Sequence, residues 1–328
     1  MNEKSATIDP PKAPAPAADA GALKACYRIQ DGRAHPCPPE EAQIIAYNNP
    51  GPAEEAEMLE RFGIDAHNLQ SSLDPDELSR LEFEETHAAL IFKRPKSYCA
   101  DDNFLLKVTS TGIFIFEDLL VVVMPDDAPL FEGRAPFPIR TMQDVILRLL
   151  YQSTGHFEGH LKAISMLSDS IEKRLTYSSD NKHLLNMFAL EKSLVFILNS
   201  LSSNRSLFEK LRISAGRLGL GEEQRDVLED LVIEIKQCYR RAEIYAEILA
   251  SLMDARASIV NNNQNQLIKK LTIVMLAVMV PQLVVSIFSM NVRLPLPGDD
   301  AMWPFWFVTG MSVATVGLVF AIWRVKKW

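Results

Sequence analysis

The chain has 328 residues, with 34 lysines and arginines against 42 aspartates and glutamates, which gives a formal net charge of −8. This acidic balance argues against a nucleic-acid partner and is compatible with the handling of cations. The four cysteines show no C-x-x-C spacing, so neither a zinc site nor a disulfide framework is predicted. The sequence has no glycine-rich phosphate loop, nucleophile elbow or kinase signature, and we therefore expect no enzyme.

The N-terminal part of the chain predicts a lead-in followed by a sheet. Residues 1–25 are rich in proline and alanine without an apolar core and are expected to be disordered. Residues 26–138 predict a cytosolic α/β domain, because runs rich in β-branched and aromatic residues alternate with turn signals. The expected strands are 43–48, 81–85, 88–94, 105–110, 113–116 and 119–124. Helices are expected over 54–62 and 74–80, the second from the Ser72-Leu-Asp-Pro start signal.

After Pro138 the pattern becomes helical. Residues 139–221 predict a helical hairpin, since apolar residues recur at helical spacing over 141–176 and 182–213 on either side of a polar turn. From Glu222 to Met290 no glycine occurs and the only proline is Pro281, so a single helix about 100 Å long is expected over 222–290. A helix of this length needs partners to bury its apolar stripe, and self-association is therefore expected.

The end of the chain predicts a transmembrane hairpin. Residues 271–290 carry no charge over about the length that crosses a bilayer, and a second apolar run, 303–323, follows a short hydrophilic loop, 291–302. Basic residues gather at the base of this hairpin, including the tail 324–328. They are Lys269, Lys270, Arg324, Lys326 and Lys327, against Arg293 alone in the loop. This asymmetry places both termini in the cytoplasm. The alternative, two buried helices of a soluble protein, is disfavoured by length, tandem placement and basic flanks.

The fold class predicted is thus an α+β membrane protein. It comprises a cytosolic α/β domain, a long helical stalk continuous with the first transmembrane helix, and a two-helix C-terminal transmembrane hairpin.

A polar stripe runs through the first span. Gln282 lies within the span, where an amide is costly against lipid and tends to face a partner helix or a water path. Spacings of three and four extend its face to Asn265, Ile268, Leu271 or Thr272, Met275, Met279 and Ser286. Around the axis of several copies this stripe would line a pore with an apolar constriction at 268–279, which gates by dewetting. The alternative is that Gln282 only hydrogen-bonds between two packed helices.

Two histidines lie four apart on a predicted helix, in the sequence His156-Phe-Glu-Gly-His160. This spacing is compatible with two metal ligands on one face, although it is not the metalloprotease pattern. A solvated helix face is the favoured interpretation.

The C-terminal region contains five features that occur together: NQLIKKLTIV at 265–274, the proline-containing span, Phe-Ser-Met-Asn at 288–291, the Leu-Pro-Leu-Pro loop and the ending WRVKKW. In these features it resembles the CorA family of divalent-cation channels and transporters. The family motif is an aromatic residue followed by Gly-Met-Asn, and here Ser289 replaces the glycine. Upstream, SSLDPDELSRLEFEETHAALIFKRPK at 71–96 resembles the family more loosely.

The resemblance implies a role for each matching position. Ser289, Met290 and Asn291 would form the selectivity motif at the outer mouth, where the Asn291 amide holds a hydrated cation. Asn265, Ile268, Leu271, Met279 and Gln282 match pore-lining positions, and Asp254 would form a carboxylate ring at the inner mouth. Asp230 matches a regulatory Mg²⁺ site between subunits, with Asp101 or Asp102 as a candidate partner. Asp299 and Asp300 in the outer loop could concentrate cations, and Arg293 opposes them. For each acid on the stalk, a solvated surface charge is the alternative.

The implied protein is a homopentamer in the inner (plasma) membrane. It would pass Mg²⁺, and Co²⁺ or Ni²⁺ as further cargo, by passive influx gated by cytosolic Mg²⁺. A zinc transporter of the same fold, with proton coupling, is the first alternative, although the stripe offers no Cys or His ligands. A membrane-anchored scaffold or sensor that transports nothing is the second.

Overall fold

The computed structural model describes residues 23–96, 105–131, 136–175, 181–290 and 302–326. The chain divides into two compact units, Met1–Ala250 and Ser251–Trp328. Each unit is described by itself.

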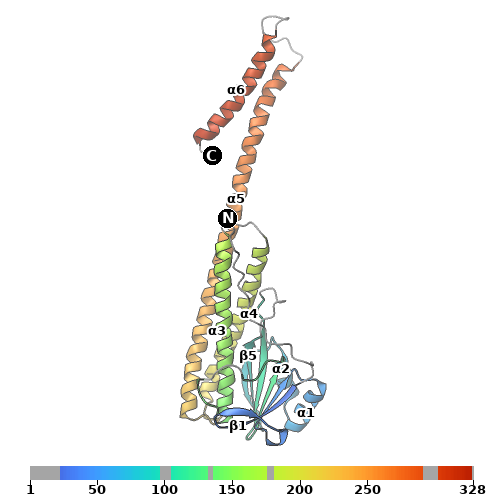
Figure 1. Ribbon diagram of the computed structural model, residues 1–328, viewed down its shortest axis with the longest axis vertical. Coiled ribbons are helices and arrows are strands. Elements are labelled where there is room, and N and C mark those ends of the chain that lie inside the picture. The colour runs from blue at the N-terminus through green and yellow to red at the C-terminus, as the bar shows by residue number, and fades with distance from the viewer. Residues whose placement is uncertain (1–22, 97–104, 132–135, 176–180, 291–301, 327–328) are drawn as a thin grey trace, which may run out of the picture. The chain divides into compact units, whose positions relative to one another are not determined.

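The first unit contains a seven-stranded sheet (Figure 1). Its strands are β1 (Leu23–Gln30), β2 (Arg33–Pro36), β3 (Ile44–Asn48), β4 (Arg80–Phe83), β5 (Ala88–Pro95), β6 (Val108–Ile115) and β7 (Leu120–Met124). Their order across the sheet is β2-β1-β3-β7-β6-β5-β4. The pair β3 and β7 is parallel, and every other neighbouring pair is antiparallel.

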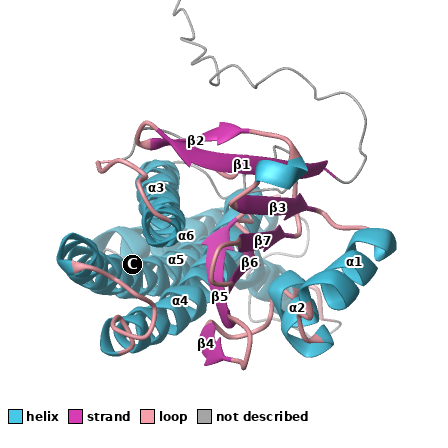
Figure 2. Ribbon diagram, turned by 90° about the horizontal axis from the view of Figure 1, so that it is seen from below, coloured by secondary structure: helices cyan, strands magenta, loops and turns pink. Residues whose placement is uncertain are grey.

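Helices cover both faces of this sheet (Figure 2). After the short 3₁₀ turn η1 (Pro39–Glu41), helices α1 (Pro52–Phe62) and α2 (Ala66–Leu73) lie on one face. The other face is covered by α3 (Met142–Leu175) and α4 (Asn181–Ile213). Because both faces are covered, the central strands are buried on both sides, and all residues of β5 and β7 are buried.

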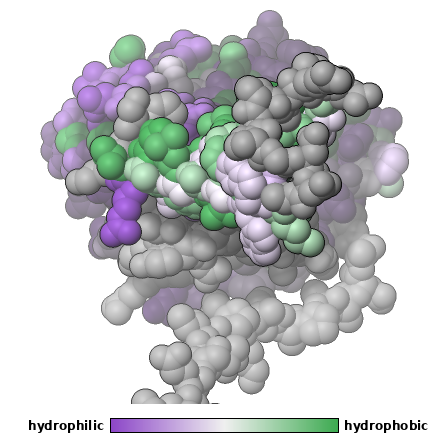
Figure 3. Space-filling view, turned by 90° about the horizontal axis from the view of Figure 1, so that it is seen from above, coloured by the Kyte–Doolittle hydropathy of each residue, from purple (hydrophilic) through white to green (hydrophobic). Residues whose placement is uncertain are grey.

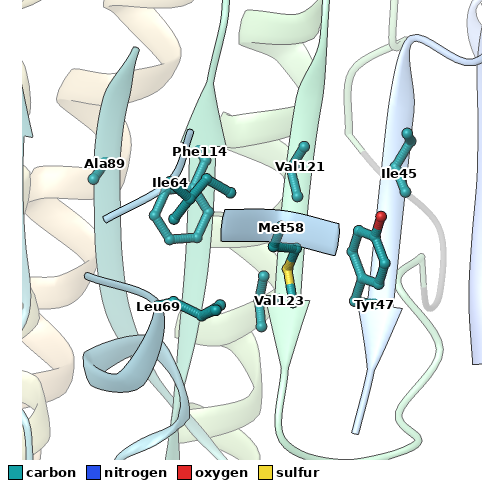
Figure 4. Close-up of a cluster of buried hydrophobic side chains, with 9 residues drawn as sticks. All are labelled: Ile45, Tyr47, Met58, Ile64, Leu69, Ala89, Phe114, Val121 and Val123. Carbon is teal, nitrogen blue, oxygen red and sulfur yellow. The ribbon is translucent and has the colours of Figure 1, made fainter. Parts of the chain in front are cut away.

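A hydrophobic cluster fills the space between the sheet and α1 and α2 (Figure 4). Met58 of α1 is fully buried against Tyr47 of β3 and Val123 of β7, and Phe114 of β6 closes the cluster. Alternate residues of each strand supply these side chains, as the period of two in a strand requires. Burying them provides much of the stabilisation of this face of the sheet.

The fifth α-helix is α5 (Glu222–Phe288), and α6 (Trp303–Lys326) is the last described element. In the first unit, α5 packs on α3 and α4 through apolar positions at helical spacing. These buried positions are Leu228, Leu231, Ile235, Cys238, Ala242 and Leu249. Lys236 pairs with Glu209 of α4 at 2.5 Å, and Arg241 pairs with Glu158 of α3. The helices expected over 141–176, 182–213 and 222–290 are therefore present with nearly the expected bounds.

The sheet domain differs from the prediction in three places, by one omission and two wrong expectations. The strands β1 and β2 were not predicted, although Asp31-Gly32 is the two-residue turn that joins them, with φ of 51° and 74°. The strands expected over 105–110 and 113–116 are one strand, β6, which runs through Gly112. A Cβ at Gly112 would collide with Ser72 of α2, so the glycine permits close helix packing and does not break the strand.

The helix expected over 74–80 is also wrong, because the helix lies earlier, at 66–73. Asp74 is its extended C-cap, and the proline that follows disfavours a helical conformation at that residue. The true start is Asp65, whose carboxylate accepts hydrogen bonds from the amides of His67 and Asn68 at 2.9 and 3.3 Å. This N-cap satisfies two amides that have no partner within the helix.

Replacing Asp65 with alanine should lower the free energy of unfolding by about 1 kcal/mol, because these two amides lose their acceptor. Thermal unfolding of the detergent-solubilised protein, followed by circular dichroism, measures the change. Glu60→Ala, at an exposed position of α1, is the control and should leave the unfolding temperature nearly unchanged. An equal loss in both variants would contradict the capping role.

Candidate functional site

The second unit exposes a large apolar surface. Its described part contains only the end of α5 and the helix α6, both long and apolar enough to cross a membrane, and neither window is buried inside the protein. Large apolar side chains of α5 stand exposed at Leu271, Val274, Met275, Leu276, Val278, Met279, Leu283, Val285 and Ile287. Figure 3 shows hydrophobic residues, in green, open on the face of the molecule seen from above. A surface of this kind is not stable in water and requires lipid or other protein as cover.

Aromatic residues mark both ends of α6. Trp303 and Trp306 lie in its first turn, with Phe305 and Phe307 beside them, and Trp323 lies near its end. Tryptophan is enriched where a transmembrane helix meets the headgroups. The aromatic residues therefore bracket a segment of transmembrane length.

The two helices turn one face of each towards the other. Within the transmembrane part of α5 the less exposed positions recur every three or four residues. They are Ile273, Ala277, Val280, Pro281, Val284 and Phe288. The less exposed positions of α6 follow the same period and are Pro304, Val308, Met311, Ser312, Thr315, Val316 and Val319. Since α6 is the other described helix of this unit, it shields this face of α5.

The predicted pore stripe lies on the opposite side of α5. At 3.6 residues per turn, Met275, Gln282 and Ser286 fall roughly half a turn away from the face marked by Ile273, Ala277 and Val284. All members of the stripe are exposed, and Ile268, Leu271, Met275 and Met279 are each more than half exposed. The stripe is thus available to further helices or to water, whereas the other face is taken by α6.

Hydrogen bonding divides the polar groups of this segment into two kinds. The hydroxyls of Thr272 and Ser289 donate to carbonyls of their own helix, those of Ile268 and Ser286, at 2.8 and 2.9 Å. Within the described residues the amides of Asn265 and Gln282 make no hydrogen bond. An amide without a partner is costly at membrane depth, so Gln282 requires a partner outside the described residues or a path of water.

The two stalk carboxylates differ in position. Asp254 is exposed and lies about three helical turns before Asn265, which puts it on the face of the stripe. Asp230 is exposed in the first unit, and its charge helps to raise the pKa of Glu234, which burial raises first and Glu158 raises further. Among the described residues, no group of three His, Cys, Asp or Glu side chains could hold a metal ion. A regulatory ion at Asp230 would therefore need ligands from elsewhere.

The pair His156 and His160 is not arranged as a metal site in the described structure. Glu158, between them, forms an ion pair with Arg241 of α5. Burial, with a contribution from His156, lowers the pKa of His160 to about 4. These histidines contribute to the packing of α3, which favours neither catalysis nor metal binding.

Several predicted site residues lie outside the described part of the chain. They are Asn291 of the selectivity motif, Arg293, Asp299 and Asp300 of the loop, and Asp101 and Asp102. Of the motif, Ser289 and Met290 are described and exposed. The sequence reasoning did not identify the α6 face that meets α5, for which the small residues Ser312 and Thr315 were the available signal.

An α/β domain, a long helix and an exposed apolar hairpin define an α+β protein that enters the membrane through its last two helices. The family model described as "CorA-like Mg2+ transporter protein" matches residues 40–327, and the chain belongs to this family. It is therefore a divalent-cation transporter and not an enzyme. The predicted fold class is confirmed by comparison with solved structures.

Three similarities to known sequences and structures illustrate the relationship. The cobalt/magnesium transport protein CorA of Methanocaldococcus jannaschii is 27% identical over 282 residues, covering 83% of this chain and 86% of that protein. The complete structure of the CorA magnesium transporter from the same organism has a TM-score of 0.78 at 23% identity, covering 93% of this chain and 98% of that one. The ZntB cytoplasmic domain from Vibrio parahaemolyticus has a TM-score of 0.57 at 12% identity, covering 74% and 98%.

Proposed function

We propose that the chain assembles into a homopentameric channel that carries Mg²⁺ across the inner membrane, with both termini in the cytoplasm. Co²⁺ and Ni²⁺ are further cargo of the same pathway. The observation that carries this proposal is the stripe of α5, which faces away from α6 and holds two amides that have no hydrogen-bond partner among the described residues.

A ring of several copies would cover the apolar faces and hydrate the amides that are exposed in one copy. With α5 innermost and α6 outermost, the stripe lines a central path, and the exposed apolar faces meet lipid or neighbouring copies. Asn265 and Gln282 then face water or hydrated ions. Ile268, Leu271, Met275 and Met279 form the apolar constriction between them, which closes by dewetting.

The chemistry of the stripe suits a hydrated hard cation. Mg²⁺ dehydrates reluctantly and is held well through its water shell, and amide oxygens accept hydrogen bonds from that water. The described stripe has no His or Cys to bind Zn²⁺ directly. Zinc transport, the second candidate, is supported only by the fold likeness to the ZntB domain.

We assign the outer mouth to the motif Ser289, Met290 and Asn291 and the inner mouth to Asp254. The acidic loop residues Asp299 and Asp300 would raise the local cation concentration. Asp230 would hold a regulatory Mg²⁺ together with a carboxylate of a neighbouring copy, Asp101 or Asp102. The lack of a three-ligand group among the described residues of one chain is consistent with such a shared site.

Influx would be passive. The membrane potential supplies about 2.3 kcal/mol per charge per 100 mV, which is about 4.6 kcal/mol for a divalent cation.

Ion flux into proteoliposomes tests the proposed function. The purified protein should admit Mg²⁺ at a rate that follows an imposed potential, and protein-free vesicles serve as the control. Zn²⁺ flux that requires a pH gradient would assign the chain to zinc transport instead. The absence of flux for Mg²⁺, Co²⁺, Ni²⁺ and Zn²⁺ would contradict transport and favour the membrane-anchored scaffold.

A further inference from the structure

Cys26 and Cys37 face each other across the hairpin of β1 and β2. The register pairs Tyr27 with Pro36 and Arg28 with His35, and one further step brings Cys26 opposite Cys37. The amide of Cys37 donates to the carbonyl of Cys26 at 3.0 Å, which confirms this step. The two cysteines are eleven positions apart in the sequence, a spacing that matches no known cysteine motif. Only the fold brings them together.

Both side chains point to the same face of the sheet, because residues directly opposite in an antiparallel pair do so. Cys26 packs at the edge of the cluster that contains Ile45 and Met58. Burial raises the pKa of the Cys26 thiol, the Lys24 ammonium opposes this effect, and the nearby Cys37 adds to it. The two sulfurs are thus within electrostatic reach of each other. Both are free thiols and only half-buried, so a small reagent can reach them.

The backbone geometry is close to that of a disulfide. Directly opposite residues of a hydrogen-bonded pair have Cα atoms about 5.5 Å apart, inside the range of about 4.4–6.8 Å for disulfides. Their Cβ atoms are about 4.5–5.5 Å apart and must approach by about 1 Å. Cys37 can make this movement, since it lies beyond the last residue of β2 and between two prolines that donate no amide.

We propose that Cys26 and Cys37 form a reversible disulfide. This disulfide would be a redox-sensitive modification site in the first unit of the transporter. With a peroxide as the oxidant, one thiolate attacks the O–O bond and becomes a sulfenic acid, releasing water after protonation. The second thiol attacks this sulfur, an S–S bond forms, the S–O bond breaks and a second water leaves. The sum is two thiols and one hydrogen peroxide giving one disulfide and two waters.

The bond should be easily reduced. Forming the disulfide draws β1 and β2 closer together than their backbone hydrogen bonds hold them. Strain of this kind makes a disulfide more reducible. Two small thiol molecules, such as glutathione, restore both cysteines and leave as their own disulfide. A labile bond of this kind is typical of redox sensing in a reducing compartment.

The experiment uses the full chain in detergent with Cys99→Ser, so that Cys26, Cys37 and Cys238 remain. After treatment with hydrogen peroxide, free thiols are blocked with N-ethylmaleimide and the protein is digested with trypsin. Cleavage after Arg28 and Arg33 separates the two cysteines, so a disulfide appears as two joined peptides. We expect this species, a loss of two hydrogens from the chain, and full reversal by a thiol reductant.

Two controls make the result specific. Cys238 is 1% exposed, and burial raises its pKa to about 12, so its thiol should survive the oxidant in the same molecules. Cys26→Ser and Cys37→Ser, tested separately, should each abolish the loss of two hydrogens. Blocking of both cysteines by the maleimide after oxidation would overturn the proposal. So would sulfinic acids at separate cysteines, or disulfides between chains in place of the joined peptides.

Discussion

Replacing Gln282 with leucine should lower the flux of Mg²⁺ through the reconstituted protein about tenfold. The amide is exposed on the stripe and makes no hydrogen bond within the described chain, so in a pore it would face the hydrated ion. Leucine removes this partner and extends the apolar constriction beyond Met279 by a turn. A loss of about 1.4 kcal/mol at the barrier, close to one net hydrogen bond, corresponds to the tenfold change.

Val285→Leu is the control for this substitution. Val285 is half exposed on the same helix but lies off the stripe, so a larger aliphatic side chain there should leave the flux nearly unchanged. Flux is measured with an ion-sensitive dye inside vesicles, at equal amounts of inserted protein. If Gln282→Leu transports as well as the parent chain, the amide only joins packed helices, and the stripe does not line the path.

The helices of this protein were predictable because the sequence patterns that indicate them extend over many neighbouring residues. The absence of glycine from Glu222 to Met290 and the uncharged run after Lys270 are properties of neighbouring residues, and α5 follows them closely. The sheet was harder, because pairing joins distant segments. Gly112 indicates a break when only its neighbours are considered, yet in the fold it gives α2 room against β6.

In the candidate site too, local patterns were predictable and contacts between distant segments were not. The stripe was found from helical spacing alone, because its members share one helix. Which side of α5 meets α6 was not found in this way, since the faces of the two helices that meet carry mostly apolar residues, as most other faces of the two spans do. The pairing of Cys26 with Cys37 was likewise hidden, because it depends on the register of a hairpin that Asp31-Gly32 alone could have indicated.

Acidification from pH 7 to pH 5 should lower the free energy of unfolding of the first unit by about 2 kcal/mol through His160 alone. The pKa of this histidine is lowered from 6.5 to about 4, first by burial and then by His156. Its buried Nδ1 has no hydrogen-bond partner in the described structure, and Glu158 nearby is engaged by Arg241. Among the described residues, no counter-charge therefore stabilises the protonated imidazole of His160 in the folded state.

The loss of stability on acidification follows from the lowered pKa of His160. The unfolded chain takes up a proton at His160 near pH 6.5, whereas the folded chain does so only near pH 4. The contribution is thus complete above pH 6.5 and is lost as the pH falls through this window. Burial also lowers the pKa of His87, which adds a loss in the same direction.

Thermal unfolding of the full chain in detergent at pH 7 and pH 5 isolates the contribution of His160. His160→Gln, which cannot titrate, should lose about 2 kcal/mol less than the parent chain on acidification, a difference of about 4–8 °C in unfolding temperature. His35→Gln, at an exposed position of β2, should keep the full pH dependence of the parent. If His160→Gln and the parent chain lose the same stability between these pH values, His160 is protonated in the folded protein, and its environment must supply the counter-charge that we infer is absent.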